Sequence, residues 1–190
     1  TLDDGSLTGP NGDLDPRGAT TAADLVRQTD KIVAALVELD ADIIGLQELE
    51  NNGFGTDSAI AALVDALNTA LGANVYGYVD PGVPFVGTDA ITTGIIYKTA
   101  VVAPVGAQVL TFAEDSAAAT YALVDTIQQQ TGTSPVGDYQ RNRPSIAATF
   151  VDADGSEVTV VADHFKSKGS SGLDTLVSDA IGAGVSQTLI

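Results

Sequence analysis

The stretch that decides the fold is Thr21–Glu50, TAADLVRQTDKIVAALVELDADIIGLQELE. Its first part repeats apolar residues at helical spacing and keeps charged residues elsewhere, which predicts a helix over about 21–39. Asp40-Ala41-Asp42 breaks this pattern. The continuous apolar run Ile43–Leu46 that follows is typical of a strand buried on both faces. The sequence therefore predicts a helix, a tight turn and a buried strand, in this order.

The rest of the chain continues with one helix and then with short β-like runs. A second amphipathic helix is predicted over about Ser58–Leu71, and Gly72 marks its end. Five apolar runs separated by Gly, Pro and Asp predict strands: Val75–Val79, Thr93–Lys98, Ala100–Val105, Ile146–Val151 and Val158–Ala162. Helices and strands that interleave without strict alternation favour a mixed α and β domain with a mainly antiparallel core. We predict a single domain over residues 1–190, with an insertion at 112–140.

Composition narrows the class of protein. The 190 residues include 25 acidic and 8 basic side chains, a formal net charge of −17, and no Cys, Met or Trp. Hydrophobic residues make up 44% of the chain, enough for a packed core, so intrinsic disorder is not expected. Without cysteine there is neither a disulfide scaffold nor a thiolate metal site. No apolar run approaches the ~20 residues that cross a bilayer, so no membrane partner is expected.

Two acidic residues are candidates for chemistry in the first half of the chain. Glu48 follows the apolar run Ile43–Leu46 by two residues, where we expect the strand to leave the core. A carboxylate at such a place suits a hard cation such as Mg²⁺; the alternative is a solvated acid at a strand end. Asp89, in the sequence GTDA, is either a functional loop acid or the cap of a turn.

A basic cluster marks the second half. His164 is the only histidine, and it lies in the sequence ADHFKSKGS that follows the run Val158–Ala162. Half of the eight basic residues fall between positions 141 and 168, namely Arg141, Arg143, Lys166 and Lys168. Imidazole, guanidinium and ammonium groups bind phosphate through charge-assisted hydrogen bonds. The cluster favours a local anion site over a loop whose lysines only aid solubility.

The turn sequence Asp152-Ala153-Asp154-Gly155 separates two of the predicted strands. Asp-Gly between two apolar runs is a strong signal for a β-hairpin. Such a hairpin would place Arg143, which precedes its first strand, at the same end as His164, which follows its second strand. We therefore expect these two side chains to converge.

Five short motifs occur in an order that matches a known superfamily: GLQELENNG at 45–53, GTDAI at 87–91, IIYK at 95–98, RPSI at 143–146 and ADHFKSKGS at 162–170. Together they resemble the endonuclease/exonuclease/phosphatase superfamily, in particular the secreted bacterial extracellular deoxyribonucleases. The resemblance implies an α+β fold, a four-layer α/β sandwich in which two packed, mainly antiparallel sheets are flanked by helices. It also implies hydrolysis of phosphodiester bonds with Mg²⁺, or with Mn²⁺ or Ca²⁺ in its place.

The resemblance also implies roles for individual residues. Glu48 matches the metal-binding glutamate of the family, and His164 matches the histidine that contacts the scissile phosphate. Arg143 falls where related nucleases place a phosphate-contacting arginine, and Arg141, Lys166 and Lys168 would assist it. Asp163 stands where relatives have asparagine and would orient His164. The implied substrate is nucleic acid, DNA in the first place, with no protein partner, and the implied location is outside a bacterial cell.

Two departures from the family pattern are expected to matter. The family's first strand motif and its C-terminal motifs, a Gly-Asp motif with asparagine and an Asp-His pair, are missing from the 190 residues. We therefore expect a fold truncated at both ends, an active site completed by residues outside this chain, and an isolated chain that is inactive. Two alternatives stay open: a noncatalytic module that binds nucleic acid or metal, and a phosphatase or sphingomyelinase of the same superfamily.

Overall fold

The computed structural model describes residues 5–16, 18–111, 126, 129, 142–165 and 173–184. The chain divides into two compact units, each considered by itself. The first comprises Thr1–Leu110 and Pro144–His164, and the second comprises Thr111–Arg143 and Phe165–Ile190. All strands named below and the first two helices belong to the first unit. The second unit contains helix α4 (Leu173–Gly182), in which Ala180 is buried.

Two capped helices confirm the local signals of the first half. Helix α1 (Ala22–Leu39) begins after Thr21, whose hydroxyl accepts a hydrogen bond from the main-chain N–H of Asp24. Helix α2 (Ala59–Leu71) begins after Ser58, whose hydroxyl accepts from Ala61 N, and it ends at Gly72 with φ +69°. Both caps satisfy main-chain groups that a helix end leaves without a partner.

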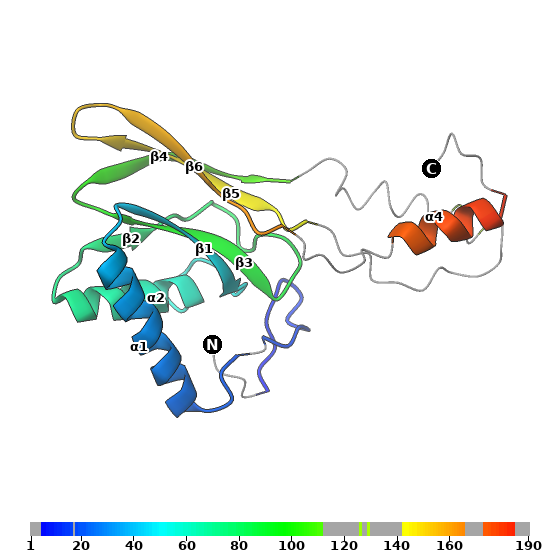
Figure 1. Cartoon of the computed structure of the whole chain (residues 1–190), viewed down its shortest axis with the longest axis horizontal. Helices are drawn as coiled ribbons and strands as arrows, with labels where there is room; N and C mark the ends of the chain where they lie inside the picture. The colour runs from blue at the N-terminus through cyan, green and yellow to red at the C-terminus, as the bar shows by residue number, and fades with distance from the viewer. Residues whose placement is uncertain are drawn as a thin grey trace. The chain divides into compact units, whose positions relative to one another are not determined.

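Six strands form two three-stranded antiparallel sheets (Figure 1). The first sheet has the order β1 (Ile43–Glu50), β3 (Ile91–Lys98), β2 (Tyr76–Tyr78). The second has the order β4 (Val102–Leu110), β5 (Ser145–Asp152), β6 (Glu157–Ala162). The predicted α+β class with two packed antiparallel sheets is confirmed. No helix in the part of the chain that the structure describes is long and apolar enough to span a membrane.

The core lies between the two sheets and under α1 and α2. Tyr97 of β3 and Phe150 of β5 meet across the sheets with ring centroids 5.3 Å apart. A Cβ built on Gly45 would lie 3.7 Å from the Cβ of Ala162, so β1 and β6 also approach closely. On the other face of the first sheet, Leu67 of α2 is fully buried. Apolar burial of this kind is the main driving force for folding, at roughly 25 cal/mol per Å².

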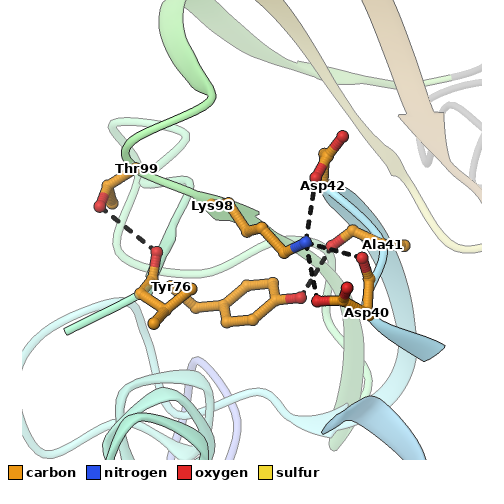
Figure 2. Close-up of polar contacts among 7 residues, drawn as sticks. Asp40, Ala41, Asp42, Tyr76, Lys98 and Thr99 are labelled. Atoms are coloured by element: carbon orange, nitrogen blue, oxygen red, sulfur yellow. Dashed lines mark hydrogen bonds and ion pairs between the residues drawn. The ribbon is translucent and has the colours of Figure 1, made fainter. Parts of the chain in front are cut away.

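A polar cluster anchors the end of α1 to the first sheet (Figure 2). The Lys98 ammonium, on a side chain only 15% exposed, donates to the main-chain oxygen of Asp40 at 2.7 Å and lies 2.9 Å from its carboxylate and 3.1 Å from that of Asp42. The hydrogen bond to Asp40, followed by that to Asp42, raises the pKa of Lys98. The Tyr76 hydroxyl donates to the carbonyl of Ala41 at 2.8 Å. The Asp-Ala-Asp turn that breaks the helical pattern is therefore also a fixed junction.

The predicted strands differ from the structure mainly at their ends. The run expected at Ala100–Val105 is β4 at Val102–Leu110, because its partner β5 offers a longer edge than the apolar pattern indicates. The apolar run Ile43–Leu46 is the first half of β1, which continues to Glu50. The predicted hairpin is confirmed: β5 and β6 pair from Ile146↔Ala162 to Val151↔Glu157 through the turn that includes Gly155. The insertion predicted at 112–140 lies, apart from residues 126 and 129, outside the described residues.

Candidate functional site

The site is built around an irregularity in β1. Leu46 and Leu49 each have a regular partner in β3. Between them, Gln47 and Glu48 together face the single residue Thr93, which makes a β-bulge. Glu48 has φ +58°, a left-handed conformation that costs a non-glycine residue roughly 1–2 kcal/mol. Strain of this kind at a β-bulge is often found at functional sites.

The bulge decides where the Glu48 side chain goes. In a regular strand Glu48 would share a face with Leu46, two residues earlier. That face packs on α2, because a Cβ built on Gly94 would lie 2.6 Å from Leu49 and 2.8 Å from Ile60 of that helix. Because the bulge adds one residue, Leu49 lies on the face of β1 that packs on α2, and Glu48 does not. The Glu48 side chain is accordingly 71% exposed. Glu48 therefore lies outside the core, as the sequence predicts, but a bulge within the strand is what exposes its carboxylate.

His164 lies next to this carboxylate. Its Nε2 atom is 3.7 Å from Oε1 of Glu48, and its side chain is 17% exposed. The other ring nitrogen, Nδ1, is buried and has no hydrogen-bond partner among the described residues. The structure thus brings together the two residues that the sequence singles out as metal ligand and phosphate contact.

Asp163 makes two hydrogen bonds, and both are to residues of neighbouring strands. Its carboxylate accepts from the hydroxyl of Ser145, the first residue of β5. Its main-chain carbonyl accepts from the side-chain amide of Gln47. The carboxylate of Asp163 is therefore engaged with the first residue of β5.

A buried asparagine holds the loop that contains Asp89. Asn51 is fully buried, and its amide donates to the carbonyls of Val86 at 3.1 Å and of Asp89 at 2.9 Å. Its side-chain oxygen accepts from Val86 N at 3.3 Å. The Asp89 carboxylate accepts from the main-chain N–H of Ala90 at 2.7 Å. Asn51 thereby fixes this loop next to the end of β1.

The described residues do not test the placement of the other predicted site residues. Arg143 is partly buried and belongs to the second unit, whereas His164 ends the first. Their convergence therefore stays a prediction, although the hairpin on which it rests is present. Arg141, Lys166 and Lys168 lie outside the described residues. Within the described ranges, no three His, Cys, Asp or Glu side chains form a cluster that could hold a metal ion.

Two residues of the site have no assigned role in the sequence-based prediction: Gln47 and Asn51. Strand alternation puts Gln47 on the same side as Gly45, toward the second sheet. Gln47 is exposed at this position, so alternation alone does not require a hydrogen-bonding partner for its amide. Asn51 also has only a weak signal, since asparagine after a strand is as typical of an exposed turn as of a buried network.

Comparisons with known proteins find similarity among solved structures. No protein-family model matches the chain, and no curated protein matches its sequence. Among solved structures, an endonuclease/exonuclease/phosphatase family protein from Bacteroides thetaiotaomicron is similar, with a TM-score of 0.39 and 16% sequence identity. The match covers 86% of this chain and 55% of that chain. This chain therefore spans about half the length of that protein.

Proposed function

We propose that this chain contributes to a metal-dependent hydrolase that cleaves phosphodiester bonds of nucleic acid, DNA in the first place. The observation that carries the proposal is the distance of 3.7 Å between Oε1 of Glu48 and Nε2 of His164. The glutamate side chain is exposed and its backbone is strained, whereas the imidazole is mostly buried. Glu48 belongs to the first sheet and His164 follows the last strand of the second, and each lies in one of the five motifs that resemble the nuclease superfamily. The acidic, cysteine-free composition supports secretion by a bacterium as part of the same proposal.

The Glu48 carboxylate is a suitable donor for one part of the coordination shell of a magnesium ion. Mg²⁺ is typically held by one or two carboxylates, several waters and substrate phosphate oxygens, so an exposed single carboxylate such as Glu48 is an appropriate ligand. Mn²⁺ and Ca²⁺ also prefer carboxylate oxygens. When bound, the ion would polarise the phosphoryl group and offset charge that develops in the transition state.

His164 would act on the phosphate itself. An imidazole N–H at Nε2 can donate to a phosphate oxygen, and a donor fixed before the reaction stabilises developing negative charge best. The ring is fixed because most of it is buried while Nε2 faces the exposed Glu48 carboxylate. In the same proposal Arg143, with Arg141, Lys166 and Lys168, contacts neighbouring phosphates.

The net charge of −17 requires that the attraction for nucleic acid be local. A bound divalent cation reverses the sign of the charge at Glu48, and a bound ion is often the largest local charge in a site. Long-range repulsion between an acidic protein and DNA is screened by salt, with a Debye length of about 10 Å at 0.1 M. We therefore expect cleavage to tolerate or gain from moderate salt, in contrast to enzymes that bind DNA through many lysines.

Hydrolysis of supercoiled plasmid DNA tests the proposal. Because the proposed active site includes residues outside this chain, the assay uses the full-length protein that contains it, with Mg²⁺, Mn²⁺ or Ca²⁺ and with EDTA, alongside Glu48→Gln and the matched control Glu157→Gln. Glu157 is an exposed glutamate at the start of β6, at the end remote from His164. We expect cation-dependent cleavage that Glu48→Gln reduces by ~10² or more and that the control leaves unchanged. Equal rates for Glu48→Gln and wild type would overturn the metal-ligand role.

A second readout separates catalysis from binding. Because the chain has a single histidine, the imidazole signals in an NMR spectrum belong to His164. Paramagnetic Mn²⁺ held by Glu48 would broaden these signals in wild type and in Glu157→Gln but not in Glu48→Gln. Broadening without cleavage of DNA would overturn the nuclease and favour the noncatalytic module, and cleavage of small phosphomonoesters only would favour the phosphatase.

A further inference from the structure

The two residues that follow β6 are held by side-chain hydrogen bonds rather than by pairing in the sheet. The β5–β6 ladder stops at the pair Ile146↔Ala162, so Asp163 and His164 extend beyond its last pair. Two bonds fix this extension. The Ser145 hydroxyl donates to the Asp163 carboxylate, and the Gln47 amide donates to the Asp163 carbonyl. The second bond crosses from one sheet to the other.

The carbonyl that Gln47 binds belongs to the peptide unit that leads into His164. A peptide unit is planar, so fixing its oxygen fixes the plane in which the His164 nitrogen lies. Few rotations then remain between that plane and the imidazole ring. Gln47 is also the residue before Glu48 in the same bulge. The hydrogen bond between Gln47 and Asp163 therefore connects two neighbouring pairs of residues, Gln47 with Glu48 on β1 and Asp163 with His164 after β6.

We propose that Gln47 is a positioning residue, whose amide sets the His164 imidazole opposite the Glu48 carboxylate. Its expected effect on turnover rests on the proposed function, whereas its effect on the position of His164 does not. The group that Gln47 contacts, the Asp163 carbonyl, is an acceptor. A donor is thus required at position 47, and the amide of glutamine supplies one at the length that spans the two strands.

Isosteric substitution isolates the donor. Gln47→Glu keeps the shape of the side chain, but a carboxylate cannot donate to the Asp163 carbonyl and repels it. Gln47→Met keeps the length without either polar group. The Gln47 side chain is exposed, so losing its bond should leave the fold intact, and thermal unfolding followed by circular dichroism verifies this. Gln108→Glu on β4, also exposed, is the matched control for the added charge.

The position of His164 is read from nuclear Overhauser contacts between its ring protons and the Glu48 side chain. We expect the contact in wild type and in Gln108→Glu, and its loss in both Gln47 variants. In the DNA cleavage assay, we expect kcat to fall about tenfold in the Gln47 variants with KM nearly unchanged, because misplacement of a reacting group lowers the chemical step more than binding.

The outcomes separate the two claims. If wild type cleaves no DNA but the Overhauser contact is lost in the Gln47 variants, the positioning role stands and the nuclease proposal fails. If both Gln47 variants keep the contact, the positioning role is overturned whatever the activity. A loss of contact in Gln108→Glu as well would also overturn it, because added negative charge alone would then explain the effect.

Discussion

Oε1 of Glu48 and Nε2 of His164 lie 3.7 Å apart, at an edge where the first strand of the first sheet meets the end of the last strand of the second. The two side chains differ in environment. Glu48 is 71% exposed and adopts φ +58°, whereas His164 is 17% exposed. The glutamate side chain is therefore open to solvent, whereas the histidine beside it is mostly buried.

The strain at Glu48 predicts a separation of stability from function. Glu48→Gly and Glu48→Ala both remove the carboxylate, but only glycine adopts a positive φ without steric cost. We expect Glu48→Gly to be the more stable of the two by about 1 kcal/mol in urea unfolding. Neither variant should retain Mn²⁺ broadening of the His164 signals. An alanine variant as stable as the glycine variant would show that the bulge stores no strain.

Removal of the imidazole should affect turnover far more than folding. In the cation-dependent cleavage assay, we expect His164→Ala to reduce kcat by ~10² or more, the usual effect of deleting a donor that stabilises transition-state charge. Thr159→Ala, an exposed change on β6, serves as the control. A loss of activity under about twofold would remove His164 from the transition-state contacts.

The adjacent asparagines should respond in opposite ways to the same substitution. Asn51→Asp replaces a buried amide that donates to two carbonyls with a group that can only accept, which should cost at least about 2 kcal/mol. Asn52 is exposed, and its side-chain oxygen accepts from the first N–H of α2 at 2.9 Å. Asn52→Asp keeps this acceptor at a helix N-terminus and should change stability by less than about 0.5 kcal/mol.

Hydrogen exchange checks the asparagine pair further. If Asn51 fixes the loop that carries Asp89, the amides of residues 86–90 should exchange faster in Asn51→Asp and at the wild-type rate in Asn52→Asp. Unchanged exchange in both variants would assign the order of this loop to other contacts.

The junction of α1 with the first sheet predicts sensitivity to alkali. Burial raises the pKa of Tyr76 above its usual value of 10.0, so the folded state binds this proton more tightly than the unfolded chain. The resulting contribution of Tyr76 to the stability of the fold is present below about pH 10. It is lost as the pH rises further, because the Tyr76 hydroxyl ionises at a lower pH in the unfolded chain than in the folded one. Tyr76→Phe should lower stability at neutral pH by about 1 kcal/mol through loss of the bond to Ala41.

The comparison with wild type tests the sign of this effect. Denaturant unfolding between neutral pH and pH 11 should show the advantage of wild type over Tyr76→Phe shrinking above about pH 10. Stability curves that stay parallel over this range would exclude the Tyr76 hydroxyl as the group that titrates.

Much of the fold could be predicted because its signals are local. Thr21, Ser58 and Gly72 cap helices through groups within a few residues of each other, and Gly155 turns a hairpin. These are properties of short peptides, and apolar periodicity adds which face is buried. The ends of β1 and β4 are less predictable than these local features, since each strand ends where its partner strand stops pairing with it.

The site was predictable in part. Glu48 and His164 lie in recognisable motifs, and their proximity follows once both motifs sit at one end of the strands. The bulge at Gln47 and Glu48 was not predictable, because it exists only against Thr93 of β3. The bond from Gln47 to Asp163 and the junction of Lys98 with Asp40 likewise join residues far apart in the chain.

The sequence by itself determined the two capped helices, the antiparallel hairpin and the residue types that the site offers, because these depend on neighbouring residues and on chemistry alone. Only the tertiary structure decided that the Glu48 carboxylate leaves the helix-facing side of β1 and meets His164. The reason is that strand register is a property of a pair of strands: one extra residue reverses the alternation of side chains, and no single strand specifies it.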